Sequence, residues 1–228
     1  MFIIKSKRAR DILRIVIPFV LIPLAALAGA LIFGEKNHLL ISFLAAILAV
    51  VLFIAGFEKK VAGARRTVIV AVMIALSVAG RFIPFFKPVT AITSITAIYL
   101  GGEAGFLVGA LSALISNFYF GQGPWTAFQM LAWGLIGLLA GFLSKPLRKS
   151  RLALSLYGVV SGIAFSLVMD AWTVLWYNEG FDLTLYLSAL LTALPHTLLY
   201  AVSNFIFLWF MAKPFGEKLG RIKIKYGV

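Results

Sequence analysis

Apolar runs of membrane-spanning length dominate the chain and are separated by short polar or glycine-containing connections. A helix needs roughly 20 apolar residues to cross the hydrocarbon core of a bilayer. The pattern predicts eight helices, over residues 12–33, 39–57, 67–83, 89–100, 104–120, 125–143, 152–177 and 183–211. The fourth is short and rich in threonine. We therefore predict an all-α integral membrane protein.

The predicted helices form two groups. Residues 1–64 form an N-terminal two-helix extension with basic ends, and residues 65–228 form a six-helix core with a basic tail. Ala26, Leu27 and Ala28 resemble a signal-peptidase site, but the apolar run around them is longer than an ordinary signal segment. We expect the first helix to be retained.

Composition supports the membrane assignment and limits the chemistry. The chain is 62% hydrophobic and 13% charged, with a mean hydropathy of +1.01. It has no cysteine, which excludes disulfides, thiolate nucleophiles and thiolate metal sites. It also lacks an HExxH motif and a P-loop, and its two histidines are isolated as His38 and His196. We expect no catalytic residue and no metal site.

The 21 lysines and arginines are unevenly distributed among the connections. All except Lys36, Arg81 and Lys87 lie near the start of the first predicted helix, after the second, after the sixth, or in the C-terminal tail. Cytoplasmic loops of membrane proteins carry an excess of such residues. We therefore expect both termini in the cytoplasm and residues 82–87, 120–125 and 178–182 outside. The same clustering argues against a nucleic-acid partner, despite a net charge of +13.

Residues 117–133, NFYFGQGPWTAFQMLAW, combine a turn with aromatic and amide side chains. The glycines permit unusual backbone angles, and Pro124 suits the first turn of a helix. Trp125, Gln129 and Trp133 then recur every four residues, so they are predicted to share one helix face. Such a stripe below a tight turn is typical of the mouth of a ligand pocket. A plain hairpin with an interfacial aromatic belt has the same pattern.

Few polar side chains lie deep within the predicted helices. Asp170 is the only acid there, and because a charge inside a membrane is costly, we expect it to face the bundle or a wet cavity. His196, Tyr200 and either Ser203 or Asn204 fall on one polar stripe of the last helix. Structural roles compete with ligand binding for each: an interhelical hydrogen bond for Asp170, and backbone groups freed near Pro195 for His196.

Small residues recur at four-residue spacing on three helices, as Ala71, Ala75 and Ala79, as Gly105 and Gly109, and as Gly137 and Gly141. Such faces let helices approach closely in lipid. We expect the glycines to serve packing within the bundle. The alanine face begins near the cytoplasmic end and is a candidate docking surface for another membrane protein.

Residues 65–211 resemble the substrate-binding S component of energy-coupling factor (ECF) vitamin transporters. AVMIA at residues 71–75 is similar to the AxxxA motif of the first core helix in that family. GRFIPFFKPVTAI at residues 80–92 and the run GGEAGFLVGALSALISNFYFGQGPWTAFQMLAWGLIGLLAG at residues 101–141 extend the resemblance. The long run is similar to S components proposed to take up cobalamin in Gram-positive bacteria. The first two helices depart from the six-helix pattern, and the resemblance gives them no role.

The resemblance implies a subunit of the bacterial cell membrane that binds a vitamin from outside and associates with a transmembrane T component and two cytoplasmic ATPases. Reorientation in the membrane would deliver the vitamin, and this chain would bind no cofactor because the partner ATPases use the ATP. Ala71, Ala75 and Ala79 would face the T component, and the three outer connections would gate the pocket. Helical spacing assigns the pocket lining to Trp125, Gln129, Trp133, Asp170, Trp176, Tyr177, His196 and Tyr200. The cations, amides and aromatic residue near the outer connections complete the predicted substrate site, as Arg81, Phe86, Lys87, Asn117 and Gln122.

Cobalamin suits walls that combine tryptophans with amides. Other vitamins remain alternatives, including a pyrimidine precursor and pantothenate, which requires a cation that only Arg81 or Lys87 supplies. A stand-alone secondary transporter is a further alternative, but it predicts inverted repeats that the sequence does not display. A membrane enzyme acting on lipid phosphates would need clustered acids or cations near one interface, and the acids of this chain are scattered.

Overall fold

The computed structural model describes residues 4–33, 37–57, 60–84, 86–178 and 180–227. Within these ranges the chain is helical and contains no strand, which confirms the all-α prediction. The helices are α1 Lys7–Val16, α2 Ile22–Ala28, α3 His38–Ala55, α4 Lys60–Gly80, α5 Val89–Leu100, α6 Gly102–Phe120, α7 Trp125–Phe142, α8 Ser144–Lys149, α9 Arg151–Tyr177 and α10 Leu183–Tyr226, with π-helical segments η1 Ile17–Leu21 and η2 Gly29–Phe33. Lys36, Lys59 and Glu179, which belong to predicted connections, lie outside the described residues.

Seven described helical segments are long and apolar enough to cross a membrane, the first of them Lys7–Ile32. The predicted fourth span is α5, whose bounds agree with the prediction, but it is shorter than the others. At 1.5 Å per residue it rises only about 18 Å, less than the roughly 30 Å of a hydrocarbon core. Nearly all of α5 is buried, so neighbouring helices surround it on all sides.

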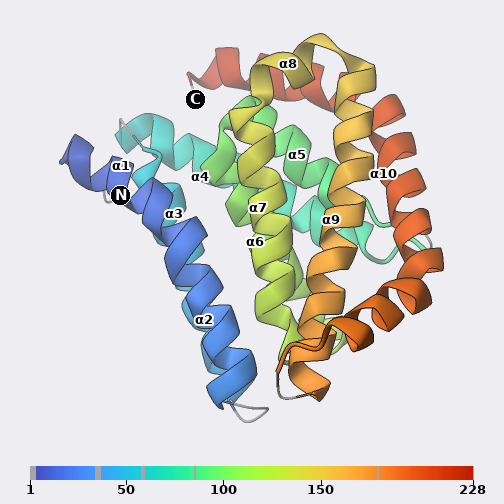
Figure 1. Ribbon diagram of the computed structural model, residues 1–228. Helices are drawn as coiled ribbons and strands as arrows, with labels where there is room; N and C mark the ends of the chain where they lie inside the picture. Colours follow the sequence, from blue (N-terminus) through green and yellow to red (C-terminus); the bar gives the residue numbers. More distant parts are fainter. Residues whose placement is uncertain (1–3, 34–36, 58–59, 85, 179, 228) are drawn as a thin grey trace.

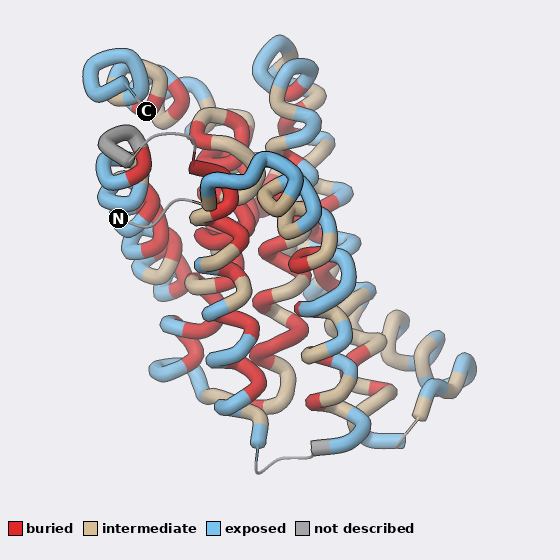
Figure 2. The backbone as a smooth tube through the Cα atoms, turned by 90° about the vertical axis from the view of Figure 1, so that its left-hand side faces the viewer, coloured by how far each residue is buried: buried red, intermediate tan, exposed pale blue. Residues whose placement is uncertain are grey.

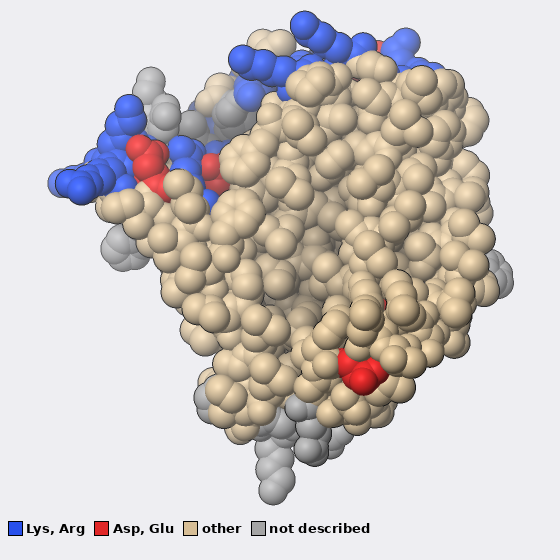
Figure 3. All heavy atoms as spheres, in the orientation of Figure 1, with Lys and Arg blue, Asp and Glu red and all other residues tan. Residues whose placement is uncertain are grey.

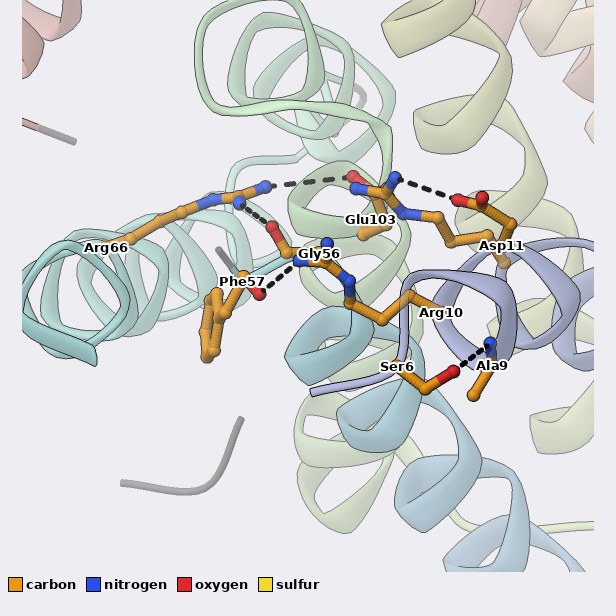
Figure 4. Close-up of polar contacts among 9 residues, drawn as sticks. Ser6, Ala9, Arg10, Asp11, Gly56, Phe57, Arg66 and Glu103 are labelled. Carbon is orange, nitrogen blue, oxygen red and sulfur yellow. Dashed lines mark hydrogen bonds and ion pairs between the residues drawn. The ribbon is translucent and has the colours of Figure 1, made fainter. Parts of the chain in front are cut away.

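Contacts between distant segments place the predicted inner ends of the helices together. Glu103, at the start of α6, is 2.7 Å from Arg14 Nε and 3.8 Å from an Arg66 terminal nitrogen of α4. Arg66 also donates to the Gly56 carbonyl after α3, and Arg10 donates to Phe57 O (Figure 4). These interactions tie the N-terminal helices to the core at one end of the bundle, where they cover α6 and α7 (Figure 1).

Glycines let α6 and α7 pack with their backbones nearly touching. A Cβ atom added at Gly109 would lie 2.4 Å from Trp133 O, and one at Gly137 would lie 2.4 Å from the Gly105 carbonyl carbon. Gly141 meets Gly102 in the same way. The expectation that both glycine pairs serve packing inside the bundle is confirmed, and α6–α7 forms the centre of the buried core (Figure 2).

Three segments predicted as connections or tail are helical instead. The basic connector before residue 67 is the first part of α4, the basic loop at residues 145–151 contains α8, and α10 continues through the tail to Tyr226. The tail was predicted to be a basic tail without a helix because it carries many charges. It forms an amphipathic helical segment, in which Gly216 and Leu219 are buried. Pro195 and Pro214 lie within α10, where each removes a helical hydrogen bond, and the helix bends around the bundle in Figure 1.

Charge and apolar surface are separated along the molecule. Lysines and arginines gather at the upper end in Figure 3, over α8, the end of α10 and the N-terminal helix, above a broad uncharged band. Large apolar side chains are exposed on several of the described helices, including Leu40, Val68 and Val160. This is the surface expected of a protein surrounded by lipid, and both termini lie toward its basic end. That this end faces the cytoplasm stays a prediction.

Candidate functional site

A cavity of about 380 Å³ lies where the α4–α5 connection meets the end of α6 and the middle of α10. Four of the predicted pocket residues, Arg81, Lys87, His196 and Tyr200, line it. Its other walls are Phe82, Ile83, Pro84, Phe120, Leu199 and Ser203. Aromatic and apolar surfaces thus surround a small number of nitrogen and hydroxyl groups, the composition typical of a small-molecule site.

Arg81 is the buried cation of this cavity, with only 8% of its surface exposed. It directly follows α4, and one terminal nitrogen donates to Ser116 Oγ and, at 2.8 Å, to Asn117 Oδ1, both on α6. No carboxylate of the described residues forms an ion pair with it, and its Nε is buried without a hydrogen-bond partner. Arg81 therefore keeps unused donor capacity and a positive charge that no carboxylate of the described residues neutralises.

Three side-chain amides that were predicted to line the pocket do not line this cavity: those of Asn117, Gln122 and Gln129. They instead form a hydrogen-bond network that supports Arg81. Asn117 Nδ2 donates to Thr126 Oγ1 and Gln129 Oε1, each at 2.9 Å. Thr126 in turn donates to Gln122 Oε1 at 3.0 Å, and Gln122 Nε2 donates to the Leu114 carbonyl at 2.8 Å. This network joins the end of α6, the GQGP turn and the first turns of α7. It fixes the orientation of Asn117 and hence the position of the guanidinium.

Aromatic rings enclose the guanidinium on its other sides. Its carbon lies 4.9 Å from the centre of the Phe120 ring and 5.2 Å from that of Trp133. Trp133 is fully buried and stacks on Phe165 of α9, with ring centres 4.6 Å apart. Phe165 lies next to Tyr200, a wall of the cavity. Cation–π contacts are strongest where water is excluded, so Trp133 and Phe120 help to stabilise the unpaired charge.

Lys87 brings a second positive charge to the same cavity from the α4–α5 connection. Burial lowers the pKa of the Lys87 ammonium, and the positive charge of Arg81 lowers it further. Both effects disfavour the charged form of the Lys87 side chain. A ligand group that carries negative charge or accepts hydrogen bonds would relieve this repulsion.

The remaining predicted residues lie away from the cavity wall. Trp125 contacts Trp172 at a ring separation of 5.9 Å, and Trp172 stacks on Trp176, in a cluster that also includes Ala26 of the N-terminal extension. Asp170 accepts from Ser166 at 3.5 Å.

Two other residues that were predicted to line the pocket, Phe86 and Tyr177, also lie away from the cavity wall. Phe86 packs against Phe207 of α10. Tyr177 is 78% exposed at the end of α9. The 178–182 turn, predicted to gate the pocket, contributes none of the lining residues in the described part of the chain.

The alanine face predicted for docking is exposed and forms the floor of a groove. Ala71, Ala75 and Ala79 lie along it, flanked by Ile74, Val78 and Phe82 of the α4 side and by Leu111 and Ile115 of α6. The groove has a volume of about 840 Å³. Phe82 also lines the first cavity, so the groove and the cavity share a wall.

Two site residues, Ser116 and Thr126, were not predicted from the sequence, and both belong to the hydrogen-bond network around Arg81. Ser203 and Phe82 line the cavity. Ser203 lies on the polar stripe predicted for the last helix, and Phe82 belongs to the predicted outer connection at residues 82–87. Nothing in the sequence distinguished Ser116 from the many other small hydroxyl residues of the helices.

Comparison with known proteins identifies the family to which the chain belongs. The family described as "ECF-type riboflavin transporter, S component" matches residues 62–219, which is more than half of the chain. A UPF0397 protein of Vibrio atlanticus (strain LGP32) is 29% identical over 141 residues, covering 56% of this chain and 74% of that protein. No solved structure gives a significant match. The match over α4 to α10 shows that the chain belongs to the ECF-type riboflavin transporter S-component family.

Proposed function

We propose that the protein is the substrate-binding subunit of an ECF-type vitamin importer and that the cavity beside Arg81 holds the vitamin. The observation that carries the proposal is a buried arginine with unused donor capacity and no carboxylate partner among the described residues, at the wall of an aromatic-lined cavity. A buried charge without a partner is unfavourable. A ligand oxygen at Arg81 and Lys87 would supply the missing interaction.

Riboflavin is the substrate that we favour. Its flat fused ring suits walls such as Phe82, Phe120 and Tyr200, and its two ring carbonyls are acceptors for a guanidinium. The cavity volume of about 380 Å³ is near the lower end of the roughly 300–1,000 Å³ of ligand pockets. This size supports a compact vitamin over cobalamin, our prediction from sequence, which would require the residues around 81–88 to move outward.

Pantothenate is the second candidate, for a specific reason. The structure brings Arg81 and Lys87, the two cations that an acidic vitamin requires, to one cavity. A carboxylate would form charge-assisted hydrogen bonds there, which are stronger than those of a neutral carbonyl.

Delivery of the vitamin would involve partner subunits. The exposed Ala71, Ala75 and Ala79 face fits the docking role that the family resemblance assigns to it, since small residues allow close approach of another helix in lipid. The T component and two ATPases are then the expected partners, with ATP hydrolysis on the ATPases.

Titration of the purified, detergent-solubilised protein with riboflavin, cobalamin and pantothenate tests the proposal. Saturable binding of riboflavin, or of pantothenate, that is lost in Arg81→Met would support the cavity as the site. Arg221→Met is the matched control, because the Arg221 side chain is 78% exposed and, among the described residues, forms an ion pair only with Glu217. Binding of cobalamin alone would restore the sequence-based prediction. Failure of all three vitamins to bind, both to this chain and to a complex with the T component and ATPases, would overturn the proposal.

A further inference from the structure

A second cavity lies toward the opposite end of the bundle, among the ends of α5 and α10, α8 and the start of α9. Its volume is about 280 Å³. One part of its wall is apolar, and the other part is charged. The lining residues are Ile95, Ile98, Tyr99, Leu147, Arg148, Lys149, Arg151, Leu154, Ala212, Lys213 and Glu217. This cavity shares no lining residue with the proposed vitamin site.

Four cations and one acid border the cavity. The acid, Glu217, lies 3.8 Å from Arg221, a residue outside the wall, so part of its charge is already engaged. Positive charge therefore exceeds negative charge at this site. The start of α9 increases the excess, because its first turn contains Arg151 and no acidic residue, at the end of a helix where the backbone is also positive.

Tyr99 fixes the wall of the cavity. The Arg148 guanidinium lies 4.8 Å from the centre of its ring, and Lys223 donates to the Tyr99 carbonyl at 3.1 Å. Gly216 of α10 packs so closely on this side chain that an added Cβ would lie 2.3 Å from the Tyr99 hydroxyl. Arg151 is held separately, 5.6 Å from the Trp209 ring. The cavity is thus formed by packed elements and is not a gap between loose side chains.

The cavity is bordered by α8 and by the later part of α10, elements over which lysines and arginines gather in Figure 3, and its apolar residues come mainly from α5 and α9. Ile95, Ile98 and Leu154 offer a surface for hydrocarbon, and Arg148, Lys149 and Lys213 offer donors for an anion. A soluble phosphate would use only the charged part of this wall. An acidic phospholipid would use both, and basic pockets between membrane helices are suited to anionic headgroups.

We propose that this cavity binds the phosphate of an anionic phospholipid, with the start of its acyl chains against the apolar wall. The lipid headgroup neutralises the uncompensated cations and anchors α8 and the end of α10 at the membrane surface. The proposal is independent of which vitamin the protein binds.

Native mass spectrometry of the purified full chain with phosphatidylglycerol, phosphatidylcholine of the same acyl chains, or inorganic phosphate tests the site. We expect preferential retention of phosphatidylglycerol. Each cation near a lipid headgroup contributes about fivefold, so the triple variant Arg148→Gln, Lys149→Gln, Lys213→Gln should bind on the order of 100-fold more weakly. The matched control is Lys145→Gln, Lys218→Gln, Lys225→Gln, which removes equal charge from exposed positions outside the cavity.

A second variant, Ala212→Phe, fills the apolar wall without changing charge and should also reduce phosphatidylglycerol retention. Equal retention of the two lipids, or equal loss in both triple variants, would overturn the proposal, because general surface charge would then explain the binding. Displacement of phosphatidylglycerol by inorganic phosphate at the same concentration as the lipid would identify a soluble anion, and not a lipid, as the ligand. If the triple variant of Arg148, Lys149 and Lys213 bound lipid as the unmodified protein does but no longer associated with the ATPases, the ligand of the cavity would be an acidic protein surface. The proposal would then be wrong.

Discussion

Replacement of Arg81 by methionine separates ligand binding from folding at the proposed vitamin site. Methionine retains an apolar side chain of similar length against the Phe120 and Trp133 rings but removes the charge and every donor. A hydrogen bond to a charged group contributes about 1.5–3 kcal/mol, which corresponds to roughly tenfold to a hundredfold in affinity. We expect vitamin binding to weaken by that factor for each ligand oxygen that Arg81 contacts.

The same substitution has opposing effects on stability. Asn117 Oδ1 loses its donor, and an unsatisfied buried acceptor costs about 1–3 kcal/mol. Removal of an unpaired buried cation offsets this loss, since burial of such a charge is itself unfavourable. We therefore expect the thermal midpoint of the detergent-solubilised protein to change by no more than about 4 °C.

Isothermal titration calorimetry and a thermal melt of each variant provide the measurements. Arg81→Lys should bind with intermediate affinity, because an ammonium keeps the charge but lacks the planar fork of donors. Asn117→Ala should also weaken binding, since it removes the acceptor that orients Arg81. Vitamin affinity of Arg81→Met within about twofold of the unmodified protein, with an intact fold, would refute the assignment of this cavity.

Four other predictions concern docking, packing, the extension and charge. Ala71→Leu with Ala75→Leu should abolish uptake in cells but leave vitamin binding by the isolated chain unchanged, as measured by transport and titration; loss of binding as well would exclude a docking role. Gly137→Ala should lower stability by about 1–3 kcal/mol, because its Cβ would overlap the α6 backbone, and a thermal melt against Gly220→Ala, whose Cβ would make an ordinary contact 3.8 Å from the Tyr99 ring, measures the difference. Deletion of residues 1–57 should leave binding intact, and an aggregated product on size-exclusion chromatography would show that the extension belongs to the core. The folded-state pKa of Lys87 is lowered, so between that lowered pKa and the ordinary value of 10.5 the unfolded chain binds more protons than the folded one. Stability should therefore rise with pH across this window, and Lys87→Met should reduce the rise in pH-dependent melts.

Most helices were predictable because their ends carry local signals. Gly101 and Gly121 have positive φ angles of 97° and 104°, which glycine adopts readily, and they end α5 and α6 close to the predicted positions. Asp182 accepts from the Leu185 amide at 2.8 Å and caps α10, as the polar turn before it indicated. The tail was missed because its helix is stabilised by packing against Tyr99, a contact distant in sequence.

The candidate site was predictable in part, for geometric reasons. Arg81, Lys87, His196 and Tyr200 were assigned to one pocket and do line one cavity. The stripe on α7 was less informative, since residues four apart differ by about 40° around a helix with 3.6 residues per turn. Over eight residues this rotation places the three side chains in different surroundings. Trp125 contacts Trp172, Gln129 belongs to the amide network, and Trp133 is buried in the core.

The long last helix connects the two proposed binding sites. His196, Tyr200 and Ser203 line the vitamin cavity just after Pro195, and Ala212, Lys213 and Glu217 line the basic cavity around Pro214. Each proline lacks the amide hydrogen that a straight helix requires, so both cavities lie where α10 can bend.

This placement has a mechanical consequence. α10 packs chiefly on α9, and only 6% of its membrane-spanning window is buried. Fewer contacts therefore hold α10 in place than hold the glycine-packed α6 and α7. On the two proposals made above, a lipid that holds the part after Pro214 at the membrane surface would leave the bend at Pro195 as the place where the proposed vitamin cavity opens. The buried α6–α7 pair, which orients Arg81 through Asn117, would meanwhile stay fixed.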